Sequence, residues 1–122
     1  MLRPYVDFLG HLIAGTSFPI RFTIDKDDVI ENIGDWTDWR LTGKTALAQT
    51  DSQALFQKTL GSGLTILSAP GGVIEGLLLP ADTIAIVKTT RVYVELQSDE
   101  AAAVWTPATG YLMVYPSVTL TA

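Results

Sequence analysis

The sequence contains no cysteine and a single histidine, His11. The absence of cysteine excludes disulfides and thiolate chemistry. One histidine cannot build a histidine-based metal cluster, and without catalytic partners we expect His11 to have a structural role. No serine occupies the Gly-x-Ser-x-Gly pattern of hydrolase nucleophiles. We therefore predict that the chain is not an enzyme and uses no cofactor.

Charge is also scarce in this chain. Charged residues make up 17%, the net charge is −5, and the 8 basic residues are scattered with no two adjacent. Nucleic acid requires a stripe of lysine and arginine, and an anionic membrane surface requires a basic cluster. No apolar stretch approaches the roughly 18 residues that cross a bilayer. The sequence therefore predicts that neither nucleic acid nor a membrane is a partner.

The length and the apolar content indicate one folded domain. A chain of 122 residues with 48% apolar residues can build a single core. We expect residues 15–122 to form the domain and residues 1–14 to form an edge strand or an arm. Asp7 and His11 interrupt the apolar segment Tyr5–Ala14, so we expect no secretory signal and predict synthesis in the cytoplasm.

Alternating apolar and polar residues are the dominant pattern. Phe18–Ile24 and Arg91–Gln97 alternate strictly, which predicts half-buried strands with Phe22 and Val94 facing the core. Glycine and proline separate further short apolar runs, the last of which is Tyr111–Tyr115, after a break at Pro107. The sequence thus predicts an all-β sandwich of seven to eight short antiparallel strands, with strand content above about 35% and helix content below about 15%.

An acidic run follows the first clear strand. Asp25, Asp27, Asp28 and Glu31 offer oxygen ligands of the kind that calcium prefers. The run lacks the glycine and the final glutamate of the helix–loop–helix calcium site. We therefore expect a hydrated hairpin turn, no metal site and no dependence of stability on divalent cations.

Three tryptophans and the N-terminal segment are the remaining candidates for binding. Tryptophans exposed on one face of a sandwich can stack on sugar rings, and Trp36, Trp39 and Trp105 could serve a carbohydrate-binding module in this way. The alternative places Trp39 in the core, with the other two at its rim or at an interface. The segment Leu2–Ile13 carries more apolar residues than a small core can absorb, which predicts a subunit interface. Its candidate residues are Tyr5, Phe8, Leu9 and Leu12.

Five segments together resemble a group of small phage and prophage virion proteins. These are Gly15–Asp25, with its Gly-polar-polar-Phe turn and alternating strand, and the strand segments Trp39–Thr42, Gly72–Ile74, Arg91–Gln97 and Tyr111–Thr119. They are similar to the immunoglobulin-like domains near phage tails and baseplates, including the N-terminal domain of siphophage upper baseplate proteins. The resemblance implies an immunoglobulin-like fold and a structural or adaptor role, carried out through protein partners. These would be copies of the chain itself or other virion subunits, assembled after synthesis in the bacterial cytoplasm.

Overall fold

The computed structural model describes residues 6–26, 29–100 and 103–117. Strand residues make up 62% of it and helix is almost absent, which confirms the all-β prediction. The strands are β1 (Val6–Ile13), β2 (Phe18–Thr23), β3 (Asp25–Lys26), β4 (Val29–Ile30), β5 (Trp36–Lys44), β6 (Phe56–Leu60), β7 (Gly63–Ser68), β8 (Val73–Leu78), β9 (Thr90–Glu100) and β10 (Ala103–Tyr115). The other regular elements among the described residues are two short turns, the 3-10 turn η1 (Asp51–Gln53) and the helical turn α1 (Pro80–Thr83).

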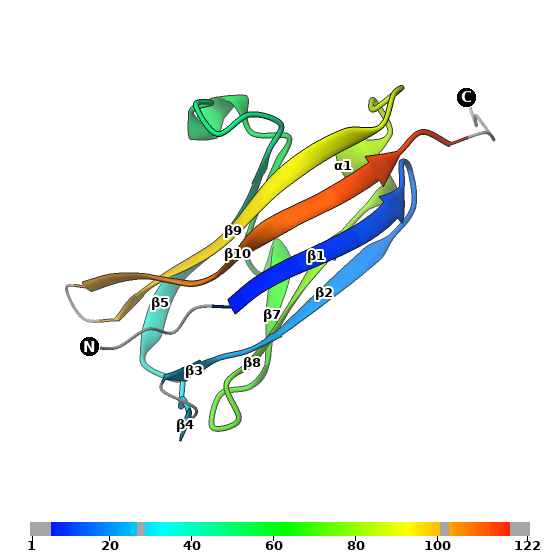
Figure 1. The fold of residues 1–122 in the computed structure, drawn as a ribbon. Coiled ribbons are helices and arrows are strands. Elements are labelled where there is room, and N and C mark those ends of the chain that lie inside the picture. Colours follow the sequence, from blue (N-terminus) through cyan, green and yellow to red (C-terminus); the bar gives the residue numbers. More distant parts are fainter. Residues whose placement is uncertain (1–5, 27–28, 101–102, 118–122) are drawn as a thin grey trace.

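Eight strands form one continuous hydrogen-bonded sheet in the order β1-β10-β9-β5-β6-β7-β8-β2. In space the sheet makes two layers: β1, β10, β9 and β5 form one, and β7, β8 and β2 form the other (Figure 1). Their orders match the C-F-G and B-E-D sheets of immunoglobulin domains, and β6 continues the first sheet as the additional strand of variable-type domains does. The protein is therefore an immunoglobulin-like β-sandwich.

Most strand pairs are antiparallel, as predicted, but two are parallel. β1 runs parallel to β10 over eight residue pairs, from Val6 with Ala108 to Ile13 with Tyr115. The short contact between β6 and β7 is also parallel. The predicted break at Pro107 is wrong: β10 continues through it, because the register shifts between Trp105 and Ala108 and the unpaired proline sits in that bulge.

The core lies between the two layers and follows the predicted phase of the strands. Phe22 and Val94 are both buried, which confirms their predicted direction. The largest fully buried side chain is Trp39, on β5. The arrangement follows from strand periodicity, since every second side chain of β2, β8 and β9 enters the same space.

Within the N-terminal segment, the described residues Val6–Ile13 form β1, an edge strand of the sandwich. Leu12 is only 5% exposed and packs in the core, so the prediction that it belongs to a subunit interface is wrong. Its direction is set by β1, where the pairing of Leu12 with Val114 turns both residues inward. Phe8 and Leu9 lie in β1, but their side chains and all of Tyr5 are outside the described residues.

One ion pair joins β6 to the helical turn. Lys58 Nζ lies 2.7 Å from Asp82 Oδ2, and the two side chains are only 12% and 16% exposed. The same carboxylate accepts a hydrogen bond from the backbone N–H of Leu79, at 2.7 Å. The Asp82 carboxylate thus caps the start of α1 and also pairs with Lys58.

Asp82→Ala should lower the free energy of unfolding by about 2–3 kcal/mol, because it removes a cap and leaves Lys58 with little water and no partner. Urea unfolding monitored by tryptophan fluorescence measures the change. The control is Asp51→Ala, since the carboxylate of Asp51 pairs with Lys44 but is 70% exposed. That variant should leave the midpoint almost unchanged. Equal losses in the two variants would show that the Lys58–Asp82 pair contributes no more than a surface contact.

Candidate functional site

The solvent side of the layer β1–β10–β9–β5 is called the outer face here. Its residues alternate with the buried residues of the same strands, so the side chains of Val92, Val94 and Leu96 point inward while their neighbours point outward. The described outward residues include His11, Ile13, Arg40, Thr42, Lys44, Arg91, Tyr93, Glu95, Gln97, Asp99, Thr109, Tyr111, Met113 and Tyr115.

Aromatic and basic side chains occupy one half of the outer face. Lys44, Tyr93 and Tyr111 lie opposite one another on three adjacent strands. The guanidinium carbon of Arg91 lies 4.3 Å from the centroid of the Tyr111 ring, within the range of a cation–π interaction. At the end of β10, the ring of His11 on the neighbouring strand β1 stacks on Tyr115 at a centroid distance of 5.9 Å. The Nδ1 atom of His11 lies 3.0 Å from the tyrosine hydroxyl oxygen.

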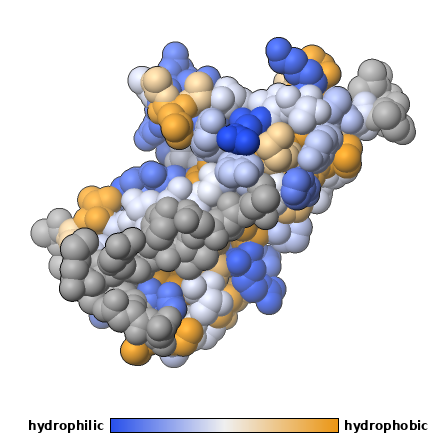
Figure 2. Space-filling model, in the orientation of Figure 1, coloured by the Kyte–Doolittle hydropathy of each residue, from blue (hydrophilic) through white to orange (hydrophobic). Residues whose placement is uncertain are grey.

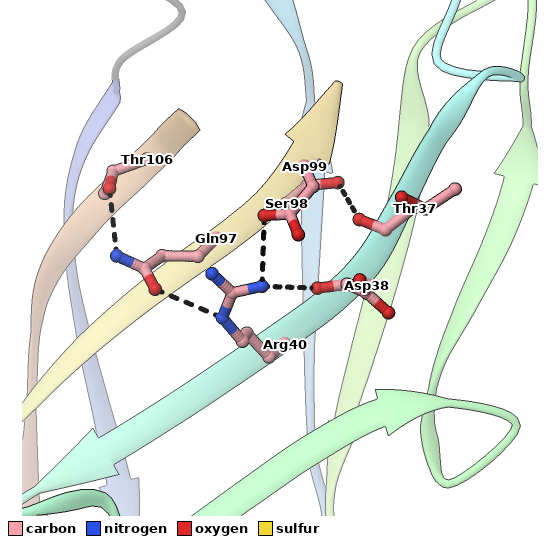
Figure 3. Close-up of polar contacts among 7 residues, drawn as sticks. All are labelled: Thr37, Asp38, Arg40, Gln97, Ser98, Asp99 and Thr106. Carbon is pink, nitrogen blue, oxygen red and sulfur yellow. Dashed lines mark hydrogen bonds and ion pairs between the residues drawn. The ribbon is translucent and has the colours of Figure 1, made fainter. Parts of the chain in front are cut away.

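A polar network occupies the other half and centres on Arg40 (Figure 3). Its guanidinium donates to Gln97 Oε1 at 3.2 Å and to the carbonyl oxygen of Asp38 at 2.8 Å, and it lies 3.5 Å from the carboxylate of Asp99. Gln97 in turn donates to the hydroxyl of Thr106 at 3.3 Å. The network spans β5, β9 and β10, so it holds three strands in register where two of them bulge.

The bulge in β5 explains the position of two tryptophans. Between Thr37 and Arg40, two residues of β5 (Asp38 and Trp39) oppose one residue of β9 (Ser98), and Asp38 takes the left-handed conformation with φ 54°. In a regular strand, residues three apart face opposite sides. The extra residue turns both Trp36 and Trp39 into the core, where their rings stack at 5.5 Å.

The tryptophans therefore do not form a sugar-binding platform. Trp36 is 3% exposed and Trp39 is 2% exposed, so neither ring face is open to a sugar. Trp105 is partly buried against the same core. The structure confirms the core position of Trp39 and leaves no pair of exposed indole rings among the residues that it describes.

Between the two halves the outer face is hollowed. The connection from β5 to β6, which includes η1, stands out from the sandwich beside β9 (Figure 1). Its residues Leu47 and Asp51 line one side of the hollow. The hollow has a volume of about 160 Å³. Its side-chain lining comes mainly from Thr42, Lys44, Leu47, Asp51, Tyr93, Glu95 and Thr109.

An ion pair fixes the wall of the hollow. Lys44 Nζ lies 2.9 Å from Asp51 Oδ1. The hydrogen bond and the charge of Lys44 lower the pKa of the Asp51 carboxyl below its usual value. Asp51 is therefore ionised at neutral pH, and the positive charge of Lys44 is balanced within the pair.

The strands on either side of the predicted acidic turn pair with each other as an antiparallel hairpin. Asp25–Lys26 pairs with Val29–Ile30, while Asp27 and Asp28 lie outside the described residues. Among the residues described, no three histidine, aspartate or glutamate side chains come together as metal ligands would. The helical turns within 6–26, 29–100 and 103–117 are also too short to cross a membrane.

The outer face combines tyrosine, arginine and methionine with other polar and charged side chains. Tyrosine, arginine and methionine are enriched in the centres of protein interfaces, and tyrosine and arginine dominate their binding energy. Here Tyr93, Tyr111, Tyr115 and Met113 are all half-buried and supported by neighbouring strands. Hydrophobic and hydrophilic areas alternate over the coloured part of the surface (Figure 2). Such a mixed surface suits contact with another protein better than burial in a hydrophobic core.

The fold and this face define an immunoglobulin-like domain with a mixed aromatic and polar sheet face. The sequence matches no family model and no curated protein. Among solved structures, the chain is similar to the NK cell receptor Nkp44, described as a triggering partner in natural cytotoxicity. The TM-score is 0.49 with 9% identity, over 92% of this chain and 99% of that chain. Nothing about function follows from a likeness of this size.

Proposed function

We propose that this domain is a non-enzymatic structural or adaptor subunit that binds another protein through its outer face. The observation that carries the proposal is the group Tyr93, Tyr111, Met113 and Tyr115, four half-buried anchors on neighbouring β-strands, with Arg91 over the Tyr111 ring. A rigid sheet presents such side chains at little entropic cost, because the strands already hold the backbone in place. Flat aromatic rings with polar tips suit an interface that must also remain soluble before assembly.

The setting that we propose is a phage or prophage tail or baseplate. It is supported by the sequence resemblance at Gly15–Asp25, Arg91–Gln97 and the other three segments. The low proportion of charged residues agrees with a subunit whose surface is partly covered by neighbours. In this setting the chain is made in the bacterial cytoplasm and joins the particle through the outer face.

The double variant Tyr93→Ser/Tyr111→Ser should fold and should fail to enter the particle. The test uses tagged full-length chain, expressed in the source bacterium in place of the native copy, followed by sedimentation of released particles. We expect the unaltered chain to sediment with the tails. The amount of the double variant in the same fraction should be lower by about tenfold or more, equivalent to about 1.4 kcal/mol of binding free energy. Thermal melting followed by circular dichroism verifies that the variant is folded.

The matched control is Leu67→Ser/Leu77→Ser. Both leucines are exposed and lie on β7 and β8, in the other layer of the sandwich. Their replacement should leave incorporation unchanged. Loss of incorporation in the control alone would place the interface on the opposite layer, and absence of the unaltered chain from particles would refute the virion role.

A further inference from the structure

The hollow of the outer face carries one carboxylate whose charge is not balanced. Lys44 is paired with Asp51, and Arg40 is paired with Asp99. The side chain of Glu95, which lines the hollow from the centre of β9, forms no ion pair or hydrogen bond with any residue that the structure describes. The hollow therefore has a net negative charge at neutral pH, in a chain whose net charge is already −5.

The nearest unbalanced positive charge on the same strand is too far away to neutralise Glu95. Arg91 is four residues earlier on β9, about 13 Å along an extended strand. This distance exceeds the screening length of about 8 Å at physiological ionic strength. Arg91 is also held against the ring of Tyr111, at 4.3 Å. Its position shows that a guanidinium group can lie over a tyrosine ring on the outer face.

The size of the hollow limits what it can hold. Its volume of about 160 Å³ corresponds to roughly five water molecules. Sites for drug-sized molecules are larger, from about 300 Å³ upward. A single long side chain of a protein partner matches the available space.

We propose that the hollow binds an arginine side chain of the protein partner. The guanidinium group pairs with the carboxylate of Glu95 and lies against the ring of Tyr93, while Leu47 covers its aliphatic stem. Arginine suits this lining better than lysine, because its planar group can stack on an aromatic ring and donate two hydrogen bonds to a carboxylate at once. The inference rests on the proposed function, since it names the chemistry that the partner presents to the outer face.

The probe is Nα-acetyl-L-arginine amide, which carries the guanidinium group and no other charge. Titrated into the full-length chain, it should shift the backbone amide signals of Glu95, Thr109 and Gly110 saturably, with a dissociation constant in the millimolar range. Nα-acetyl-L-citrulline amide has the same shape without the charge and should cause no saturable shift. Nα-acetyl-L-lysine amide should bind at least about tenfold more weakly than the arginine probe.

Glu95→Gln should abolish saturable binding of the arginine probe. Glu75→Gln is the matched control: Glu75 pairs with Arg21 on the other layer, and its replacement should leave the titration unchanged. Equal binding of the citrulline probe, equal binding of the lysine probe, or an unaffected Glu95→Gln variant would each overturn the assignment. The test is independent of particles. Arginine binding without loss of incorporation in the tyrosine variant would reject the proposed function alone, and the reverse result would reject this inference alone.

Discussion

Replacing Gly72 with alanine should destabilise the domain by about 3 kcal/mol or more, the sum of a strained backbone and a steric clash. Gly72 has φ +66°, a conformation that costs other residues about 1–2 kcal/mol. A Cβ at this position would also lie 2.7 Å from the backbone oxygens of Ile24 and Glu31. These atoms cannot rotate away as a side chain can, because Ile24 donates its own N–H to the Gly72 carbonyl at 2.7 Å.

Gly61→Ala separates the two causes. Gly61 has a similar φ of +79°, but nothing lies within 4 Å of its Cβ position. Its replacement should cost about 1–2 kcal/mol, which is the backbone strain alone. Urea unfolding of both variants gives the difference. If the two glycine variants are equally stable, the contact between the β7–β8 turn and the chain after β2 is looser than described.

Phe22→Ala should cost about 3–5 kcal/mol, because it removes a buried ring and leaves a cavity between the two layers. The whole free energy of unfolding of a domain is about 5–15 kcal/mol, so the variant should unfold at a much lower urea concentration. Phe22 lies on β2 opposite Ile74 of β8, and both side chains are buried. Because Ile74 and the other neighbours of Phe22 are held in place by the sheet, their side chains can fill only part of the cavity that Phe22→Ala leaves.

The exposed neighbour Thr23 provides the control for Phe22. Thr23→Ala, at the end of β2, should change the free energy of unfolding by less than about 0.5 kcal/mol. The two variants together report the phase of the strand. A large loss in Thr23→Ala with little loss in Phe22→Ala would mean that β2 is shifted by one residue, which turns each side chain to the other face.

Strand direction could be predicted from the sequence wherever a strand is regular. Alternation placed Phe22 and Val94 inward, and it also placed Tyr93 and Glu95 outward, because the period of a strand is a local property. The bulges could not be predicted in this way. The buried positions of Trp36 and Trp39 depend on an extra residue opposite β9, and pairing between strands distant in sequence decides where such a residue can be inserted.

Only part of the candidate site on the outer face could be predicted from the sequence. The outward tyrosines of β9 and β10 are readable from alternation, yet no local pattern relates them to one another. The hollow forms because the β5–β6 connection brings Asp51 to Lys44 beside Glu95. Loop positions depend on tertiary contacts and side-chain pairing, so a signal for this site appears only once the strands have been assembled.

The parallel pairing of β1 with β10 has a mechanical consequence. β1 begins at one end of the sandwich and β10 finishes at the opposite end (Figure 1). Tension applied between the start of β1 and the end of β10 would therefore slide the two strands past each other along their length. All hydrogen bonds of the eight-residue ladder carry that shear together and cannot open one after another. A domain connected in this way resists extension far better than one whose terminal strands peel apart, and its lifetime under load is set by its rate of forced unfolding.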